Sequence, residues 1–240
     1  MPIDAQRLTL FNGLSIIIPV YNAQDTLKEL AARLVKVLEQ ITNSFEILLI
    51  NDGSRDNSWQ IIQELAGQDK RFHGTDLIRN YGQINALMCG LKQARFDLAL
   101  TMDDDLQHPP EEIPLLLSLM ETGQYDVVYG VYDQKKDSWL RMLGSEFIDF
   151  LYNRIFHKPS QLKLSSFRLI GPECLLAIKN YPPPYLQLHP IILNKTRKIG
   201  NVTVHHEPRK SGASGYSVNK LFGITMGLVF GQVLSRDRKR

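Results

Sequence analysis

The chain has 240 residues, of which 43% are hydrophobic and 22% charged, and its formal net charge is +3. That length suits one substantial core, and the composition excludes disordered, collagen-like and disulfide-rich proteins. The two cysteines, Cys89 and Cys174, have no ligand-like spacing to each other or to the histidines, which argues against a zinc site and suits a reducing compartment.

Hydrophobic periodicity predicts alternating strands and helices through the first half of the chain. Residues 14–20 (LSIIIPV) form a β-branched run typical of a strand buried on both faces. Residues 25–39 then carry apolar side chains at helical spacing. We expect further strands over 45–50, 74–78, 96–102 and 125–131, and further helices over 56–66, capped by Asp56, over 82–94 and over 111–120. This alternation predicts an α/β fold, with a parallel sheet and helices on both faces.

The pattern is less regular beyond residue 131. An amphipathic stretch at 138–156 predicts a helix, and 165–170 and 201–206 predict strands. The proline-rich stretch 181–185 (YPPPY) predicts a stiff connector. Glycines near 212–215 predict a flexible segment that could close over a substrate.

Three carboxylates in a row, Asp103 to Asp105, follow the strand expected over 96–102. Like charges this close repel one another unless a cation lies among them. In an extended segment Asp103, Asp105 and Gln107 would point to one side and Asp104 to the other. Oxygen ligands of this kind suit Mg²⁺ or Mn²⁺, so we expect one such ion at Asp103, Asp105 and Gln107. The alternative is an acidic cap for the helix near Pro109, which would need only one carboxylate.

Two more polar clusters follow strands. Tyr21 and Asn22 end the first strand, and Asn51 to Ser54 (NDGS) end the second. Ligands of parallel sheets bind beyond the carboxyl ends of the strands. We therefore expect these clusters and the acidic triplet to converge on one rim.

Seven segments together resemble a known family: IIIPVYN, INDGS, RNYGQINALMCGL, TMDDDLQHPPEEIP, DVVYGV, SSFRLI and HHEPRKSGASGYS. In order and spacing they are similar to the inverting family 2 glycosyltransferases of GT-A fold. The likeness is greatest to the polyprenyl-phosphate branch, which includes dolichol-phosphate mannose synthases and undecaprenyl-phosphate aminoarabinose transferases. The resemblance covers roughly residues 14 to 220. It implies a Rossmann-like, mostly parallel sheet followed by a C-terminal helical extension.

The resemblance also implies roles for individual residues. The cation at Asp103, Asp105 and Gln107 would bind the donor diphosphate, and Asp104 would lie near the ribose or the sugar. Arg79 belongs to a segment that the family places near the donor phosphates. The residues expected to hold the nucleoside are Pro19, Tyr21, Asn22 and Asp52, with Asp52 hydrogen bonded to the base.

Arg141 and Ser145 match the residues that contact the acceptor phosphate in the family, and Arg209 matches an arginine that reaches phosphate. Arginine suits this task because its fork donates two parallel hydrogen bonds to phosphate oxygens. A phosphate acceptor is already ionised, so no general base is required. The chain departs from the lipid-phosphate branch at Tyr132, where an arginine is usual, and at Gly215, where a lysine is usual.

The resemblance implies a metal-dependent inverting transferase that moves a sugar from a UDP-, GDP- or dTDP-linked donor to polyprenyl phosphate. Two alternatives stay open. One is a family 2 enzyme that acts on a saccharide hydroxyl in polysaccharide synthesis. The other is a non-catalytic module that binds a nucleotide sugar.

The carboxyl end is basic, with ten Lys or Arg against two acids from residue 195 to 240, compared with 18 against 23 before it. Its apolar stretch 218–234 is shorter than the roughly 20 residues needed to span a bilayer. We expect a glycosyltransferase domain over 1–217 and a helix over 218–240 that touches the membrane surface or packs in a homo-oligomer. The basic residues lack interleaved aromatics, which argues against nucleic-acid binding. The amino terminus has no signal-like apolar core, so a cytoplasmic location is expected, in which case membrane contact would be peripheral on that face.

Overall fold

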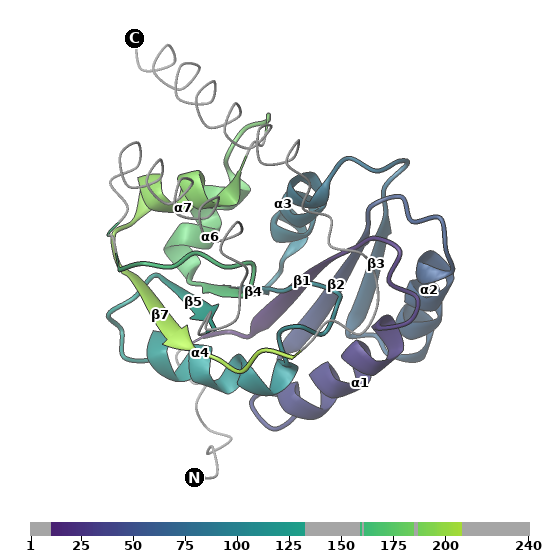
Figure 1. Cartoon of the computed structure of the whole chain (residues 1–240), viewed down its shortest axis with the longest axis horizontal. Coiled ribbons are helices and arrows are strands. Elements are labelled where there is room, and N and C mark those ends of the chain that lie inside the picture. The colour runs from purple at the N-terminus through teal and green to yellow at the C-terminus, as the bar shows by residue number, and fades with distance from the viewer. Residues whose placement is uncertain (1–10, 133–158, 160, 185–186, 208–240) are drawn as a thin grey trace, which may run out of the picture.

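The computed structural model describes residues 11–132, 159, 161–184 and 187–207. Seven strands form one sheet in the order β3-β2-β1-β4-β6-β5-β7 (Figure 1). The strands are β1 (Leu14–Val20), β2 (Phe45–Asn51), β3 (Phe72–Asp76), β4 (Leu98–Thr101), β5 (Val127–Val131), β6 (Arg168–Ile170) and β7 (Ile199–Thr203). The helices are α1 (Leu27–Leu38), α2 (Ser58–Gln68), α3 (Gln83–Gln93), α4 (Ile113–Met120), α6 (Pro172–Lys179) and α7 (Leu188–Lys195), with the 3-10 turn η1 (Pro110–Glu112) before α4.

The sheet is mostly parallel, as expected. Strand β1 pairs parallel with β2 and β4, β2 pairs parallel with β3, and β5 pairs parallel with β7. Strand β6 runs antiparallel to both of its neighbours, β4 and β5. Its amino end therefore lies at the same rim as the carboxyl end of β4, which brings the residues just before β6 to the acidic triplet.

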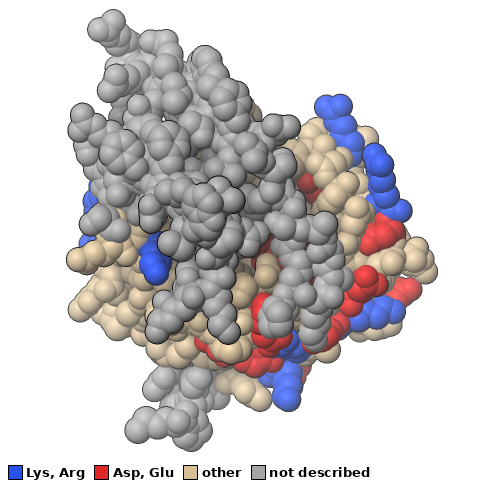
Figure 2. Space-filling model, in the orientation of Figure 1, with Lys and Arg blue, Asp and Glu red and all other residues tan. Residues whose placement is uncertain are grey.

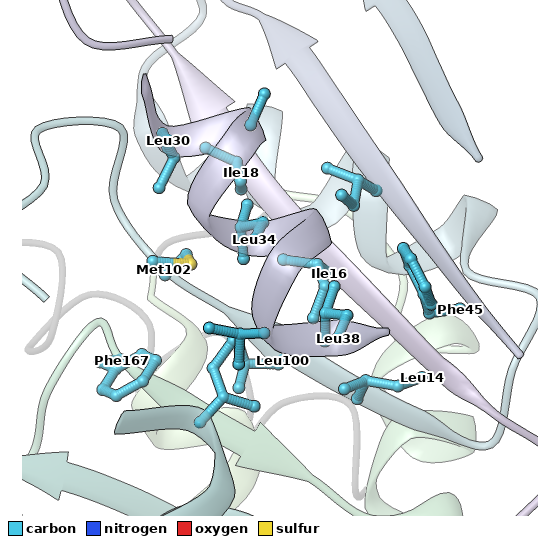
Figure 3. Packing of buried hydrophobic residues seen from close by; sticks show 14 of the residues in the cluster. Leu14, Ile16, Ile18, Leu30, Leu34, Leu38, Phe45, Leu100, Met102 and Phe167 are labelled. Atoms are coloured by element: carbon cyan, nitrogen blue, oxygen red, sulfur yellow. The ribbon is translucent and has the colours of Figure 1, made fainter. Parts of the chain in front are cut away.

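The core lies on both faces of the sheet because β1 is apolar in both directions. Ile16 and Ile18 face α1, α2 and α4, whereas Ile17 faces α3, α6 and α7. Figure 1 shows the two groups of helices on opposite sides of the strands. In Figure 3 Leu30, Leu34 and Leu38 of α1 point toward β1, which is the stripe that their i, i+4 spacing predicts. Burying one such side chain stabilises the fold by about 1.5–3 kcal/mol, so α1 is held firmly against the strand.

On the face of the sheet that α3 covers, the helix lies unusually close to β1 and β2. A Cβ atom at Gly90 of α3 would lie 2.6 Å from Cγ2 of Ile17 and 3.0 Å from Cγ1 of Ile50. Only glycine therefore lets α3 pack this near to β1 and β2. The close packing places the amino end of α3 beside the rim.

The structure corrects several sequence-based boundaries. The third strand is β3 over 72–76, because its register with β2 begins at Ile47 opposite Phe72. Helix α2 begins at Ser58 rather than at residue 56, and Asp56 accepts hydrogen bonds from the backbone N–H and hydroxyl of Ser58. The strands expected over 165–170 and 201–206 are shorter or shifted, as β6 and β7. Helices α6 and α7 were not predicted, because eight-residue apolar helices show little periodicity.

The helix expected over 138–156, the glycine-rich segment near 212–215 and the C-terminal helix over 218–240 lie outside the described residues. Within the part of the chain that the structure describes, no helix has the length and apolar character needed to cross a membrane.

Candidate active site

The polar clusters that follow β1, β2 and β4 meet at one rim of the sheet, as the sequence predicts. The backbone N–H of Tyr21 donates to Oδ2 of Asp104 over 3.0 Å. The N–H of Asn22 donates to Oγ of Ser54 over 3.0 Å, and Oδ1 of Asn22 accepts from the N–H of Arg55 over 2.8 Å. These bonds join residues more than thirty positions apart, so the three strand ends form one polar unit.

The loop that carries the acidic triplet is not extended, and this expectation was wrong. Leu106 has φ 61°, a left-handed conformation that turns the chain inside the motif, and its side chain is buried. The alternation of an extended strand therefore does not apply to residues 103–107. The three carboxylates nevertheless have different partners, because each one contacts a different segment of the chain.

Asp103 is held from two sides. Oδ1 accepts from Nε2 of Gln83 over 2.7 Å, and Oδ2 accepts from Oγ of Ser166 over 2.6 Å. Gln83 is the first residue of α3, and Ser166 precedes β6. Neither residue was predicted to belong to the site, although both lie in segments that resemble the family, RNYGQINALMCGL and SSFRLI. Each oxygen of Asp103 keeps a second lone pair for a further partner.

Asp104 occupies an environment that disfavours its charge. Its pKa is raised from 3.8 to about 7, mainly by burial and in smaller part by the neighbouring charges of Asp103 and Asp105, against the lowering effect of the Tyr21 N–H. The backbone oxygen of Asp104 accepts from Oγ1 of Thr26 over 2.6 Å, which fixes the loop to the start of α1. An excess of negative charge is therefore concentrated on the rim.

The donor set of this loop fits a hard divalent cation. Asp103 and Asp105 offer carboxylate oxygens and Gln107 offers an amide oxygen. The pKa of Asp104 is raised mainly by burial, and a cation would offset the smaller part that comes from the charges of Asp103 and Asp105. Oδ1 of Asp105 accepts from the N–H of Gln107 over 3.1 Å, which bends the loop back on itself. Within the described ranges, no three His, Cys, Asp or Glu side chains form a metal-binding group. A cation at this loop would therefore need an oxygen donor of another kind beside Asp103 and Asp105, such as the amide of Gln107.

An aromatic cluster lies beside the triplet. His108 is buried, with its ring centroid 5.2 Å from that of Phe167, and it meets His206 edge-on at 5.7 Å. His206 in turn stacks on Tyr132 at 4.0 Å. Burial lowers the pKa of His108 against the opposite effect of Asp103, so the neutral ring is favoured. Nδ1 of His108 has no hydrogen-bond partner among the described residues.

Asp52 is buried at the end of β2 and holds the loop that precedes α3. It is only 3% exposed, and its two oxygens accept from the backbone N–H groups of Tyr81 and Gly82 over 2.7 and 2.9 Å. Burial raises its pKa while these two bonds lower it. The turn after β2 also requires a glycine, because Gly53 has φ +66° and its Cβ would lie 2.6 Å from the backbone of Arg79. Asp52 thus holds the loop before α3 in addition to any contact with a nucleoside.

The other predicted site residues differ in their exposure. Pro19 is buried within β1, opposite Ile50. Tyr21 is 46% exposed at the rim. Arg79 is exposed, and its guanidinium lies 5.0 Å from the ring centroid of Tyr81. Arg141, Ser145 and Arg209 lie outside the described residues.

The chain is similar in sequence and in fold to known proteins. The model of the family described as glycosyl transferase family 2 matches residues 15–178. The chain is 36% identical over 220 residues to an undecaprenyl-phosphate 4-deoxy-4-formamido-L-arabinose transferase of Pseudomonas fluorescens (strain SBW25). The match covers 90% of this chain but only 63% of that relative, so the chain spans less than two thirds of its length.

Two solved structures share the fold. A mannosyl-3-phosphoglycerate synthase from Rubrobacter xylanophilus superposes with a TM-score of 0.69 at 16% identity, covering 100% of this chain and 80% of that one. The glucosyl-3-phosphoglycerate synthase of Mycobacterium tuberculosis, in complex with Mn²⁺, uridine-diphosphate-glucose and phosphoglyceric acid, superposes with a TM-score of 0.66 at 14% identity. That match covers 94% of this chain and 79% of the other. The expected α/β architecture of GT-A type is confirmed, and the chain belongs to glycosyl transferase family 2.

Proposed function

We propose that this glycosyltransferase moves a sugar from a nucleotide-sugar donor to a polyprenyl phosphate and that Asp103, Asp105 and Gln107 hold the divalent cation it uses. The observation that carries the proposal is the single rim at which the Tyr21 N–H donates to Asp104 of the triplet and the Asn22 N–H donates to Ser54. The acceptor is proposed from the name of the 36% identical relative. A protein of the same fold binds Mn²⁺ and UDP-glucose, which supports the choice of ion and donor class.

The donor side follows from the positions on the rim. Tyr21, exposed beside Asp104, would contact the nucleoside together with Asn22, and Asp52 would reach the base while holding the loop of Tyr81. Arg79 would lie near the donor phosphates. A bound cation would stabilise the charge that develops on the departing nucleoside diphosphate. Asp103, fixed by Gln83 and Ser166, would need no reorganisation before it engages that ion.

On the acceptor side, Arg141, Ser145 and Arg209 are proposed to hold the phosphate of the lipid. Such a phosphate is ionised at neutral pH, so the chain would need no general base. Where the lipid-phosphate branch usually has an arginine, Tyr132 stacks on His206, which gives that position a packing role. The number of cationic contacts to the acceptor would then be smaller than is usual for the branch.

Residues 218–240 are proposed to contact the cytoplasmic surface of a membrane peripherally, or to pack in a homo-oligomer. Their basic end, RDRKR, would favour anionic lipid. Of the two, only membrane contact would bring the chain near a lipid-borne phosphate.

The proposal is tested with the full chain, undecaprenyl phosphate and a series of UDP-, GDP- and dTDP-sugars in the presence of Mn²⁺. Asp105→Ala should abolish transfer, because it removes a proposed ligand of the ion. Asp97→Ala is the matched control: Asp97 bonds Asn12 and precedes β4, at the opposite end of the strand from the triplet. Undiminished transfer by Asp105→Ala would refute the metal role. Transfer to a saccharide hydroxyl but not to the lipid would refute the acceptor.

A further inference from the structure

One arginine joins three segments that are distant in the chain. Nη2 of Arg33, on α1, donates to Oε2 of Glu111 over 2.6 Å and to Oε1 of Glu207 over 3.0 Å. Nε also donates to Glu111 over 3.1 Å, and Nη1 to Glu207 over 3.4 Å. These bonds raise the pKa of Arg33 and lower that of Glu111. We call this group, Arg33 with Glu111 and Glu207, the rim clamp.

Both carboxylates of the rim clamp belong to segments that border the acidic loop. Glu111 lies in η1, which directly follows that loop. Glu207 lies beyond β7, and its backbone N–H donates to the backbone oxygen of Gln107 over 3.0 Å. Next to it, His206 packs against His108 and Tyr132. In Figure 2 acidic and basic side chains adjoin one another over α1, the helix that carries Arg33.

We propose that Arg33 is a positioning residue for the transfer reaction: by holding Glu111 and Glu207 it keeps the segment 204–207 against Gln107 and so fixes the acidic loop. This rests on the proposed function, because the loop is taken to hold the cation. Arg33 itself would touch neither the donor nor the ion.

The physical reason is that the segment 204–207 is bonded directly to the acidic loop. The left-handed conformation of Leu106 bends the loop. The N–H of Glu207 donates to the backbone oxygen of Gln107, whose side chain is the proposed amide ligand. Without Arg33, Glu111 and Glu207 would face each other as like charges and the segment 204–207 would move away from the loop. Groups that orient metal ligands typically change metal affinity by about 10–100-fold when removed.

The chain offers a matched control. Arg71 also bridges two carboxylates, donating to Glu39 over 2.9 Å and to Asp69 over 2.7 Å. Glu39 follows α1, and Arg71 immediately precedes β3, at the amino end of the sheet and away from the rim. Arg33→Met and Arg71→Met therefore each remove a guanidinium that bridges two carboxylates of other segments or turns, the first beside the acidic loop and the second near the amino end of β3. Arg33 also lies 3.6 Å from Glu29 on its own helix.

The first experiment is hydrogen exchange of the full chain, which needs neither donor nor cation. Arg33→Met should speed exchange of peptides that cover 103–108 and 204–207, whereas Arg71→Met should leave them unchanged. Equal protection of those peptides in Arg33→Met and wild type would overturn the proposal. If Arg33→Met does not fold, Arg33→Lys and Glu207→Gln replace it, and each should show the same local effect in weaker form.

The second experiment measures Mn²⁺ binding by electron paramagnetic resonance with UDP present. The dissociation constant should rise about tenfold or more in Arg33→Met, rise less in Arg33→Lys, and stay within about twofold in Arg71→Met. The midpoint temperature of thermal unfolding should fall by similar amounts in the two methionine variants. A drop in stability without any change in Mn²⁺ affinity would reduce Arg33 to a structural ion pair. Failure of the wild-type chain to bind Mn²⁺ would instead refute the metal role in the proposed function, while hydrogen exchange would still decide the rim clamp.

Discussion

Replacing Asp104 by asparagine should stabilise the protein, although the residue lies at the centre of the candidate site. The carboxylate is held between Asp103 and Asp105 in a partly buried position, and its pKa is raised from 3.8 to about 7. Asparagine keeps an oxygen that can accept the hydrogen bond from the Tyr21 N–H but carries no charge. The variant thus removes the unfavourable burial of charge and leaves the geometry in place.

The magnitude follows from linkage between protonation and folding. The unfolded chain ionises Asp104 above about pH 4, whereas the folded chain does so only above about pH 7, so the wild type loses stability as pH rises between these values. A shift of about 3 pKa units corresponds to at most about 4 kcal/mol. Asp104→Asn should gain under about 1 kcal/mol at pH 4 and up to about 4 kcal/mol at pH 8, where the difference levels off.

The assay is urea unfolding at pH 4, 6 and 8 in a chelating buffer that removes divalent cations. Asp25→Asn, at an exposed aspartate, is the control for the chemical change itself. A stability difference for Asp104→Asn that is constant with pH would refute the reasoning, because it would mean that the carboxylate is not held in a desolvated, negatively charged environment.

Two further substitutions test the support of the rim. Gly53→Ala should destabilise the fold by about 1–3 kcal/mol in urea unfolding, because its backbone is left-handed and its Cβ would clash with the backbone of Arg79. The control is Gly67→Ala, whose Cβ meets nothing within 4 Å. Equal effects of the two substitutions would contradict the steric argument. Gln83→Leu should slow transfer about tenfold while changing the free energy of unfolding by under about 1 kcal/mol, because Oδ1 of Asp103 loses its hydrogen bond. An unchanged rate would show that Ser166 alone positions the carboxylate.

Much of the framework was predictable because it depends on local patterns. The β-branched run of β1 and the leucine stripe of α1 each specify their element and its buried face. The order of strands and helices then requires that polar residues after β1, β2 and β4 share a rim. The sequence also predicted that Asp104 would differ from its neighbours, but for a reason that the left-handed Leu106 contradicts.

The contacts that finish the site were not predictable from local patterns. Nothing in the sequence around Ser166 or Gln83 indicates that both would reach Asp103, because one precedes an antiparallel strand and the other begins a helix on the opposite side of the motif. The bonds of Arg33 to Glu111 and Glu207 likewise join positions up to 174 residues apart.

The sequence by itself therefore determined the alternating elements from β1 to β5, their order and the chemical character of the rim, but not α6 and α7, because periodicity is clear only in the longer elements. Tertiary structure alone decided which side chains hold the acidic loop, how far the charge of Asp104 is disfavoured, and that α1 contributes an arginine to the rim. These properties depend on distances between segments, and such distances exist only once the sheet and its helices have packed.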